Sequence, residues 1–148
     1  MVARAIDHDP NLALARHWMG WINVYLGEVD AAIEQLKVAM RLNPRDVRIQ
    51  TAQAAMAYAH FLAGRNEEAS FWATAAVRQQ PNYLAAQRIF MACQAIAGRV
   101  GEARQACALA LRLDPTQRIS AIKIRVPLRR PEHVEKLAEA FRIAGMPE

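Results

Sequence analysis

The chain has 148 residues, of which 53% are hydrophobic and 22% are charged, and its formal net charge is +5 at pH 7. This length fits a single compact domain. No apolar run approaches the roughly 20 residues that a membrane-spanning helix needs, and the N-terminus lacks the charged segment and apolar core of a signal peptide. We therefore expect a cytoplasmic protein with no membrane partner.

An internal repeat dominates the sequence. Three glycine-to-proline intervals have the same length of seventeen residues: Gly27 to Pro44, Gly64 to Pro81 and Gly98 to Pro115. An alanine follows each glycine after five residues, at positions 32, 69 and 103, and another after twelve, at positions 39, 76 and 110. A repeat of 34 to 37 residues predicts an array of similar structural units.

The chain is predicted to begin within a preceding unit. Residues 5–10, Ala-Ile-Asp-His-Asp-Pro, imitate the end of a unit at residues 39–44, and Pro10 lies 34 residues before Pro44. We therefore assign residues 1–12 to the end of a truncated repeat and infer a piece of a longer protein. The alternative is a degenerate N-terminal cap.

Each complete unit is predicted to be a pair of helices, at residues 13–49, 50–83 and 84–115. The glycine ends the first helix, because it accepts a left-handed backbone that is costly for a residue with a Cβ. The proline closes the second helix, since it cannot continue the hydrogen-bond ladder. One pair cannot bury its own apolar face, so we expect the units to stack into an all-α array.

The repeat breaks after residue 115, and residues 116–131 are predicted to be a basic linker. No acid occurs between residues 115 and 131, and the basic residues there are Arg118, Lys123, Arg125, Arg129 and Arg130. A basic tract can bind nucleic acid, but this one lacks the aromatic residues that stack on bases. We expect a solvated linker or a surface that faces an acidic neighbouring domain, with nucleic-acid binding as the weaker alternative. A short helix near Ser120 is favoured over an extended segment.

A C-terminal capping helix is predicted at residues 132–148. Pro131 and Glu132 are typical of a helix start, and Ala144 and Gly145 of a helix end. Its apolar face comprises Val134, Leu137, Ala138, Phe141 and Ile143. We expect this helix to cover the exposed apolar face of the third unit, as terminal caps do in repeat arrays.

The repeating residues resemble the tetratricopeptide-repeat (TPR) family. In the 34-residue frame of that family, the first unit supplies Gly20, Gly27, Ala32, Leu36, Ala39 and Pro44, and the other two units supply similar sets. The early tryptophan of the family is replaced by Arg16, Gln53 and Gln87. The resemblance covers roughly residues 1–115. It implies an α-solenoid, a right-handed superhelix of stacked antiparallel helix pairs whose first helices line a concave groove.

The family's variable positions would place mainly aromatic and apolar side chains in that groove. Our candidates for binding a peptide there are Leu14, His17, Trp21, Tyr25, Tyr58, Phe61 and Arg88. Packing between helices is the alternative for each, above all for Tyr25, Phe61 and Leu62. The lysine and asparagine with which some members clamp a C-terminal carboxylate are replaced by His17 and Trp21. The resemblance thus implies an apolar helix or extended peptide as the partner, or a domain of the same parent protein. A homodimer is a further option.

The sequence offers little for catalysis. No nucleophile stands in a recognisable turn motif, no glycine-rich phosphate loop occurs, and no Cys or His cluster has metal-ligand spacing. Cys93 and Cys107 are predicted to be small buried core residues, and a disulfide between them is left open. We therefore predict that this chain is no enzyme and needs no metal and no cofactor.

The C-terminal segment carries a second resemblance. The residues involved are Arg-Ile-Ser at 118–120, Pro-Leu-Arg-Arg-Pro-Glu at 127–132, and Ala-Glu-Ala-Phe-Arg-Ile-Ala-Gly-Met-Pro-Glu at 138–148. They resemble the C-terminal end of bacterial class III adenylate/guanylate cyclase-like proteins, which carry TPR units after the catalytic domain. The first hypothesis is a non-catalytic protein–protein interaction scaffold. The alternative, implied by this second resemblance, is a regulatory or oligomerisation module of a cyclase-like signalling protein.

Overall fold

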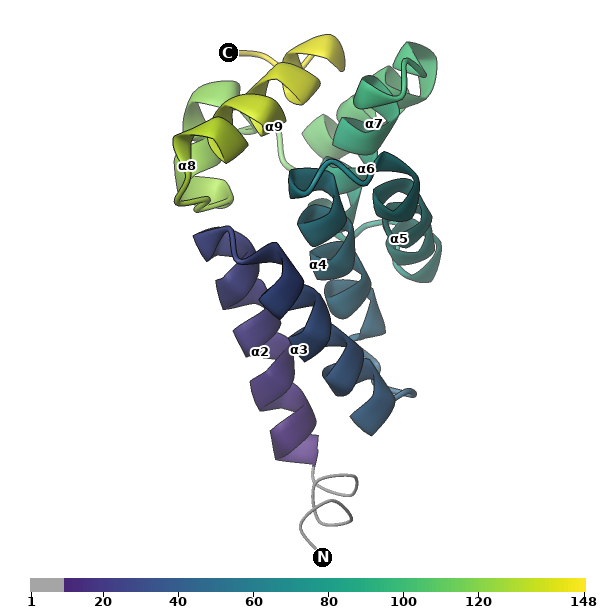
Figure 1. Cartoon of the computed structure of the whole chain (residues 1–148). Coiled ribbons are helices and arrows are strands. Elements are labelled where there is room, and N and C mark those ends of the chain that lie inside the picture. Colours follow the sequence, from purple (N-terminus) through teal and green to yellow (C-terminus); the bar gives the residue numbers. More distant parts are fainter. Residues whose placement is uncertain (1–9) are drawn as a thin grey trace, which may run out of the picture.

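The structure is a computed structural model that describes residues 10–148, and all the regular elements in that part of the chain are helices (Figure 1). The long helices are α2 (Pro10–Leu26), α3 (Val29–Leu42), α4 (Ile49–Leu62), α5 (Asn66–Gln79), α6 (Leu84–Ile96) and α7 (Val100–Leu113). They are followed by a 3-10 turn, η1 (Ile119–Ala121), and by α8 (Ile122–Arg125) and α9 (Pro131–Ile143). The predicted all-α class is confirmed.

The six helices between residues 10 and 113 pack as three consecutive antiparallel pairs: α2 with α3, α4 with α5, and α6 with α7 (Figure 1). The second helix of a pair also contacts the first helix of the next pair, so that α3 packs on α4 and α5 on α6. The first helices α2, α4 and α6 are neighbours in the same order. The first helices therefore lie side by side along one side of the three stacked pairs.

The turn inside each pair is built around a glycine with a left-handed backbone, as predicted. The φ angles of Gly27, Gly64 and Gly98 are +82°, +80° and +81°. In each turn the glycine N–H donates to the carbonyl three residues earlier, and the N–H of the next residue donates to the carbonyl five residues earlier. These two bonds satisfy carbonyls that the end of a helix leaves free.

Small residues allow the helices of a pair to lie close together. The repeated alanines of the second helices, at positions 32, 39, 69, 76, 103 and 110, are all buried. A Cβ added to Gly20 in α2 would lie 2.5 Å from two side-chain carbons of Leu36 in α3. The repeat thus places small side chains where the helices approach each other.

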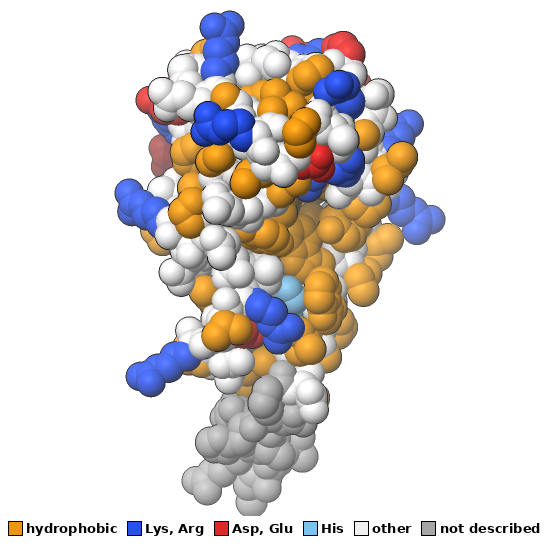
Figure 2. Space-filling view, turned by 180° about the vertical axis from the view of Figure 1, so that it is seen from behind, with side chains coloured by type: hydrophobic (Ala, Val, Ile, Leu, Met, Phe, Trp, Pro, Cys, Tyr) orange, Lys and Arg blue, Asp and Glu red, His pale blue; other side chains and the backbone are white. Residues whose placement is uncertain are grey.

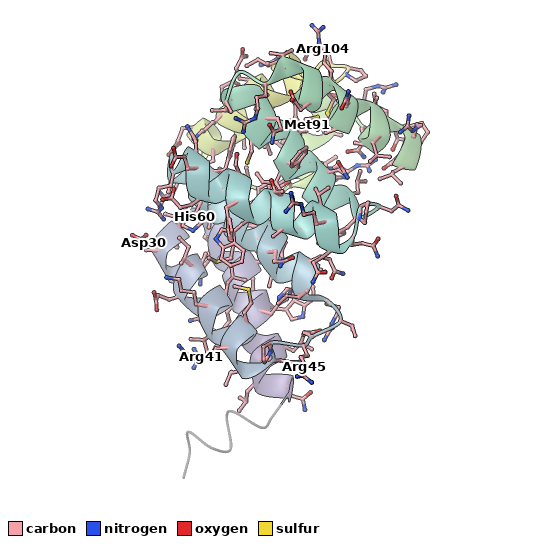
Figure 3. The ribbon with its side chains drawn as sticks, turned by 90° about the vertical axis from the view of Figure 1, so that its right-hand side faces the viewer. Asp30, Arg41, Arg45, His60, Met91 and Arg104 are labelled. Carbon is pink, nitrogen blue, oxygen red and sulfur yellow. The ribbon has the colours of Figure 1, made fainter. Side chains whose placement is uncertain are left out.

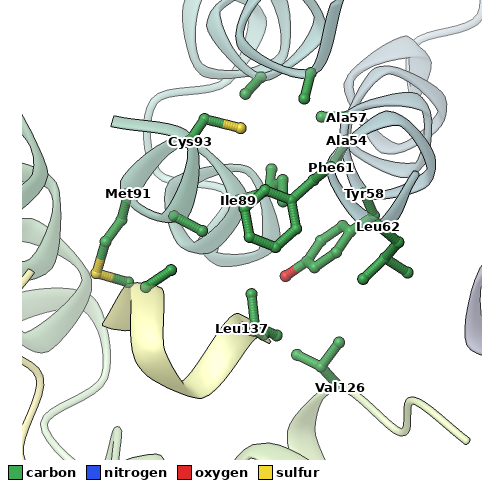
Figure 4. Packing of buried hydrophobic residues seen from close by; sticks show 14 of the residues in the cluster. Ala54, Ala57, Tyr58, Phe61, Leu62, Ile89, Met91, Cys93, Val126 and Leu137 are labelled. Atoms are coloured by element: carbon green, nitrogen blue, oxygen red, sulfur yellow. The ribbon is translucent and has the colours of Figure 1, made fainter. Parts of the chain in front are cut away.

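The core continues from the helix pairs into the C-terminal helix. Figure 4 shows Tyr58 and Phe61 of α4, Ile89 of α6 and Leu137 of α9 meeting in one cluster, and all four side chains are buried. Cys93 and Cys107 are buried free thiols, and burial raises the pKa of Cys93 to about 12. They are core residues, as predicted.

The structure describes only the last three residues of the segment that was predicted to be a truncated repeat. We assigned residues 1–12 to the end of a truncated repeat, and residues 1–9 of that segment lie outside the described residues. Helix α2 begins at Pro10, three residues before the expected start of the first unit at residue 13. Proline suits the first position of a helix, because its fixed φ is already helical and its missing N–H would have no partner there.

The expectation of a solvated linker at residues 116–131 is wrong. The segment holds η1 and α8, and its buried side chains are Gln117, Ile119, Ile122, Val126 and Leu128. The predicted short helix is present. The four buried apolar residues of the segment belong to the core, whereas Ile124 and the basic residues are exposed.

Helix α9 begins one residue before the predicted start at residue 132 and ends at Ile143, just before Ala144 and Gly145, which were predicted to end it; Gly145 has a φ of +89°. It packs against α6 and α7 and buries Leu137, Ala138, Ala140 and Phe141. The N–H of Ile119 donates to the carbonyl of Pro147 over 2.8 Å, which ties the start of the segment to the end of the chain.

The outer surface is rich in charge. Figure 3 shows Asp30, Arg41, Arg45 and Arg104 projecting from the second helices and the loop after α3. None of the helices between residues 10 and 148 combines the length and hydropathy needed to cross a membrane.

Candidate functional site

One face of α2 carries a row of large apolar side chains. Leu14, Trp18, Trp21 and Tyr25 recur every three or four residues, so they lie along one side of the helix. Trp18 is 55% exposed, and so is Ile22, one turn further along. Exposed apolar side chains that lie together are typical of a surface that contacts a partner.

A pocket of about 130 Å³ opens between this face of α2, helix α4, the start of α6 and the C-terminal segment. Its wall carries the aromatic side chains of Trp18, Trp21, Tyr25, Tyr58 and Tyr83. Figure 2 shows hydrophobic side chains running as a band from a hollow in the middle of this side of the molecule into its lower half. The pocket and the exposed row on α2 together form the candidate site, which we call the aromatic groove.

The aromatic side chains of the wall hold one another in place. The Trp21 ring lies 5.7 Å from the Tyr25 ring and 5.8 Å from the Tyr58 ring, centroid to centroid. These distances are within the range of favourable tilted aromatic pairs. Because Trp21 and Tyr58 are buried, they form the floor of the groove, whereas Trp18 stands at its edge.

The groove also holds a cation with little access to water. The Arg88 residue is only 9% exposed, and its Nε donates to Oε1 of Gln117 over 2.9 Å. None of the ion pairs found within residues 10–148 includes Arg88. A charge of this kind normally has a counter-charge, because burial without one is costly.

Gln117, which accepts the hydrogen bond from Arg88, is itself held by a hydrogen bond to Asp114. The Nε2 of Gln117 donates to Asp114 over 2.8 Å, and Asp114 also accepts bonds from the Thr116 hydroxyl and from Arg125. The bonds from Thr116, together with those from Arg125 and Gln117, hold the pKa of Asp114 well below its usual range. Asp114 is therefore ionised and already bound, so it provides no free carboxylate for Arg88.

All three tyrosines of the chain line this pocket. Burial raises the pKa of Tyr25, Tyr58 and Tyr83, the last to about 12, while the positive charge of Arg88 acts in the opposite direction on each. The three hydroxyls are therefore protonated at neutral pH. The buried Tyr58 hydroxyl has no hydrogen-bond partner among the described residues.

Four of the seven predicted groove residues come together in this pocket, namely Trp21, Tyr25, Tyr58 and Arg88. Leu14 is half-buried and does not line it. Phe61 is fully buried in the core, where Lys136 of α9 donates to its carbonyl over 2.5 Å and lies 4.6 Å from its ring centroid.

His17, the remaining candidate, is buried and bonded to another part of the fold. Its Nε2 lies 3.0 Å from Oγ1 of Thr51, whose own hydroxyl donates to the carbonyl of Arg48 over 2.7 Å. Since Thr51 has a single hydroxyl hydrogen, His17 is the donor and carries its proton on Nε2. Burial, followed by the charge of Arg48, lowers the pKa of His17. His17 thus links α2 to α4 and does not line the pocket.

Sequence reasoning missed several residues of the groove. Trp18 could have been found, because it lies one turn after Leu14 and one turn before Ile22. Tyr83 precedes α6 in a loop, and Val126 and Arg125 come from the segment expected to be a linker. The only signal for that segment was the partial alternation of Ile119, Ile122, Ile124 and Val126.

The five residues of the predicted basic patch are all exposed, but two of them are paired within the chain. Arg125 contacts Asp114 over 2.5 Å, and Arg130 contacts Glu28 over 3.4 Å. The backbone N–H of Arg129 donates to the Tyr25 carbonyl over 2.8 Å, which anchors the segment to the end of α2. The basic residues therefore belong to a folded segment, residues 116–131, that lies at one end of the groove.

Comparisons with known proteins add no family: no protein-family model and no curated protein matches the sequence. Within residues 10–148, no group of three His, Cys, Asp or Glu side chains is placed to hold a metal ion. A function is therefore proposed from the geometry and chemistry of the aromatic groove.

Proposed function

We propose that this chain is a non-catalytic protein–protein interaction scaffold of the tetratricopeptide-repeat type, with a peptide or a neighbouring domain bound in the aromatic groove. The observation that carries the proposal is the exposed Trp18 at the edge of a pocket lined by Trp21, Tyr25 and Tyr58. Aromatic side chains are favoured anchors at protein interfaces, because they contribute a large contact area with few rotatable bonds.

The repeat type is supported by the equivalence of the three helix pairs. Each pair turns at a glycine with φ near +80°, each turn has the same two hydrogen bonds, and each second helix buries alanines at the same positions. Units of this kind stack along one direction and create extended binding surfaces. A right-handed superhelix is part of the proposal.

The pocket indicates what kind of partner segment would fit. Its volume of about 130 Å³ is close to that of an apolar cavity of roughly 150 Å³ that admits benzene. One side chain of a partner can enter it, while the exposed Trp18 and Ile22 extend the contact along α2. We therefore propose a short segment with one inserted side chain and apolar neighbours.

Two exposed aromatic side chains provide the test. Trp18 lies at the groove and Phe71, 65% exposed, lies on α5 outside it. Peptides selected from a random library on the wild-type protein should bind Trp18→Ala about tenfold or more weakly, as expected for an interface anchor. The same peptides should bind Phe71→Ala with unchanged affinity, and both variants should keep the wild-type circular dichroism.

The opposite pattern would refute the proposal. If selected peptides bind Trp18→Ala as well as the wild type, or if Phe71→Ala is the variant that loses binding, the partner surface lies elsewhere. Trp21 and Tyr58 are unsuitable for this experiment, because both are buried and their truncation would damage the core.

A regulatory or oligomerisation role in a cyclase-like protein stays a prediction from the resemblance of the C-terminal segment, because none of the described residues bears on it. Nucleic-acid binding by the basic tract is not proposed, because Arg125 and Arg130 are paired with acids of the chain.

A further inference from the structure

The groove contains a cation for which residues 10–148 provide no counter-ion. A guanidinium has five N–H donors and no acceptor, and among the described residues Arg88 donates to one atom, Oε1 of Gln117. Asp114 is the carboxylate to which Gln117 is bonded, and it already accepts hydrogen bonds from Thr116, Gln117 and Arg125. The remaining donors of Arg88 are therefore available to a ligand that enters the pocket.

The hydroxyls around Arg88 strengthen this argument. The three tyrosines that line the pocket come from α2, from α4 and from the loop before α6. The hydroxyl of Tyr58 is fully buried and lacks a partner within the described residues, although most buried polar groups in proteins have one. Protonated hydroxyls and a guanidinium all donate hydrogen bonds, and a carboxylate accepts them in pairs.

The shape of the site limits how a carboxylate can reach it. Arg88 is nine-tenths buried, and the space above it is about 130 Å³. A C-terminal carboxylate is attached directly to the backbone, so the backbone would have to enter this small volume. A glutamate carries its carboxylate at the end of a slender side chain, while its backbone stays at the rim with Trp18.

We propose that the pocket binds the side-chain carboxylate of a glutamate in a partner peptide, through Arg88 and the surrounding tyrosine hydroxyls. This inference depends on the proposed peptide-binding function, and it adds the chemistry of the inserted side chain. The neighbours of that glutamate are apolar residues that contact Trp18 and Ile22, because these side chains extend the groove along α2.

Matched peptides test the inference. The probes are the capped pentapeptide Ac-Ala-Leu-Glu-Leu-Ala-NH2, its glutamine counterpart, and the glutamine peptide with a free C-terminal carboxylate. Binding is measured by titrating ¹⁵N-labelled protein and following the Arg88 Nε–H signal and the backbone signals of the pocket. The capped glutamate peptide should bind about tenfold more tightly than the capped glutamine peptide, because a charge-assisted hydrogen bond is roughly twice as strong as a neutral one.

Two variants show whether Arg88 and the hydroxyls cause the preference. Arg88→Gln should bind the two capped peptides equally. Because this change also breaks the bond to Gln117, Tyr83→Phe serves as a second variant that removes only a hydroxyl from the half-buried wall. It should keep the fold and the affinity for the glutamine peptide, and weaken binding of the glutamate peptide severalfold.

Equal binding of the two capped peptides to the wild type overturns the inference, and so does a preference that survives in Arg88→Gln. If the free C-terminus gives the tightest binding, the carboxylate comes from a chain end and the glutamate assignment is wrong. The absence of any shift in the pocket signals also overturns it. The Trp18→Ala and Phe71→Ala comparison decides separately whether the groove binds peptides.

Discussion

Gly98 and Gly101 lie three residues apart, and a Cβ added to either would meet open space. Their backbones differ, because Gly98 has a φ of +81° whereas Gly101 lies in the first turn of α7. An L-residue in the left-handed region is destabilised by the clash of its Cβ with the backbone, while glycine within a helix loses more backbone entropy than alanine.

Alanine substitutions at these two sites should therefore have opposite effects. We expect Gly98→Ala to lower the free energy of unfolding by about 1 to 2 kcal/mol, the cost of a left-handed backbone. We expect Gly101→Ala to raise it by up to about 1 kcal/mol, the helix-propensity difference between the two residues. Urea unfolding measures both, and a loss of stability in Gly101→Ala as large as in Gly98→Ala would contradict the assigned backbone difference.

At the scale of elements, α9 belongs to the same core as the helix pairs. Leu137 is fully buried and meets Tyr58, Phe61 and Ile89 (Figure 4). Lys136 donates to the carbonyl of Phe61, which adds a polar contact between α9 and α4. If these contacts join the elements into one cooperative unit, weakening α9 must weaken helices that lie far from it in the sequence.

Truncation of one core side chain tests this cooperativity. Leu137→Ala should lower the free energy of unfolding by about 2 to 5 kcal/mol, because it removes buried methyl groups and leaves a cavity. Glu139→Ala on the same helix is the control. It removes only a surface ion pair with Arg142, which is worth up to about 1 kcal/mol.

The tryptophans provide the measurement, since all three lie outside α9, at positions 18, 21 and 72. Tryptophan fluorescence and far-UV circular dichroism should report the same shifted urea transition in Leu137→Ala. If the tryptophan transition stays in place while some helix signal is lost earlier, α9 unfolds independently and the single-unit interpretation is wrong.

At the scale of the whole molecule, histidines from different helices have the same sign of pKa shift. Burial is the largest cause of the lowered pKa of His17 on α2, His60 on α4 and His133 on α9. A lowered pKa means that the unfolded chain binds protons at a higher pH than the folded chain. Stability is therefore greatest above the ordinary histidine pKa of about 6.5 and decreases as the pH falls below it.

The free energy of unfolding should accordingly fall between pH 7.5 and pH 6, a range in which ordinary carboxylates remain ionised. His17→Gln should show a smaller decrease over this range, because glutamine does not titrate and still offers an N–H donor to Thr51. Urea midpoints measured across the range are the readout. A stability that rises as the pH falls would show that the histidines are charged in the folded state.

The sequence alone determined the helix pairs and their ends. The glycine, alanine and proline positions act locally, through backbone conformation and through the size of the side chain between two helices. For this reason the turns at Gly27, Gly64 and Gly98 and the end of α9 at Gly145 were predictable. The burial of the repeated alanines follows from the same periodicity.

Only the tertiary structure decided which side chains share the groove. Arg88, Tyr25 and Tyr58 lie on three different helices, and Tyr83 and Val126 come from segments that have no place in the repeat. Tertiary packing also excluded Phe61 and His17 from the groove, although the repeat frame had assigned both residues to it. Packing of residues 116–131 brought Arg125 and Val126 to the groove, whereas contacts with Thr51 of α4 and with Lys136 of α9 hold His17 and Phe61 in other places.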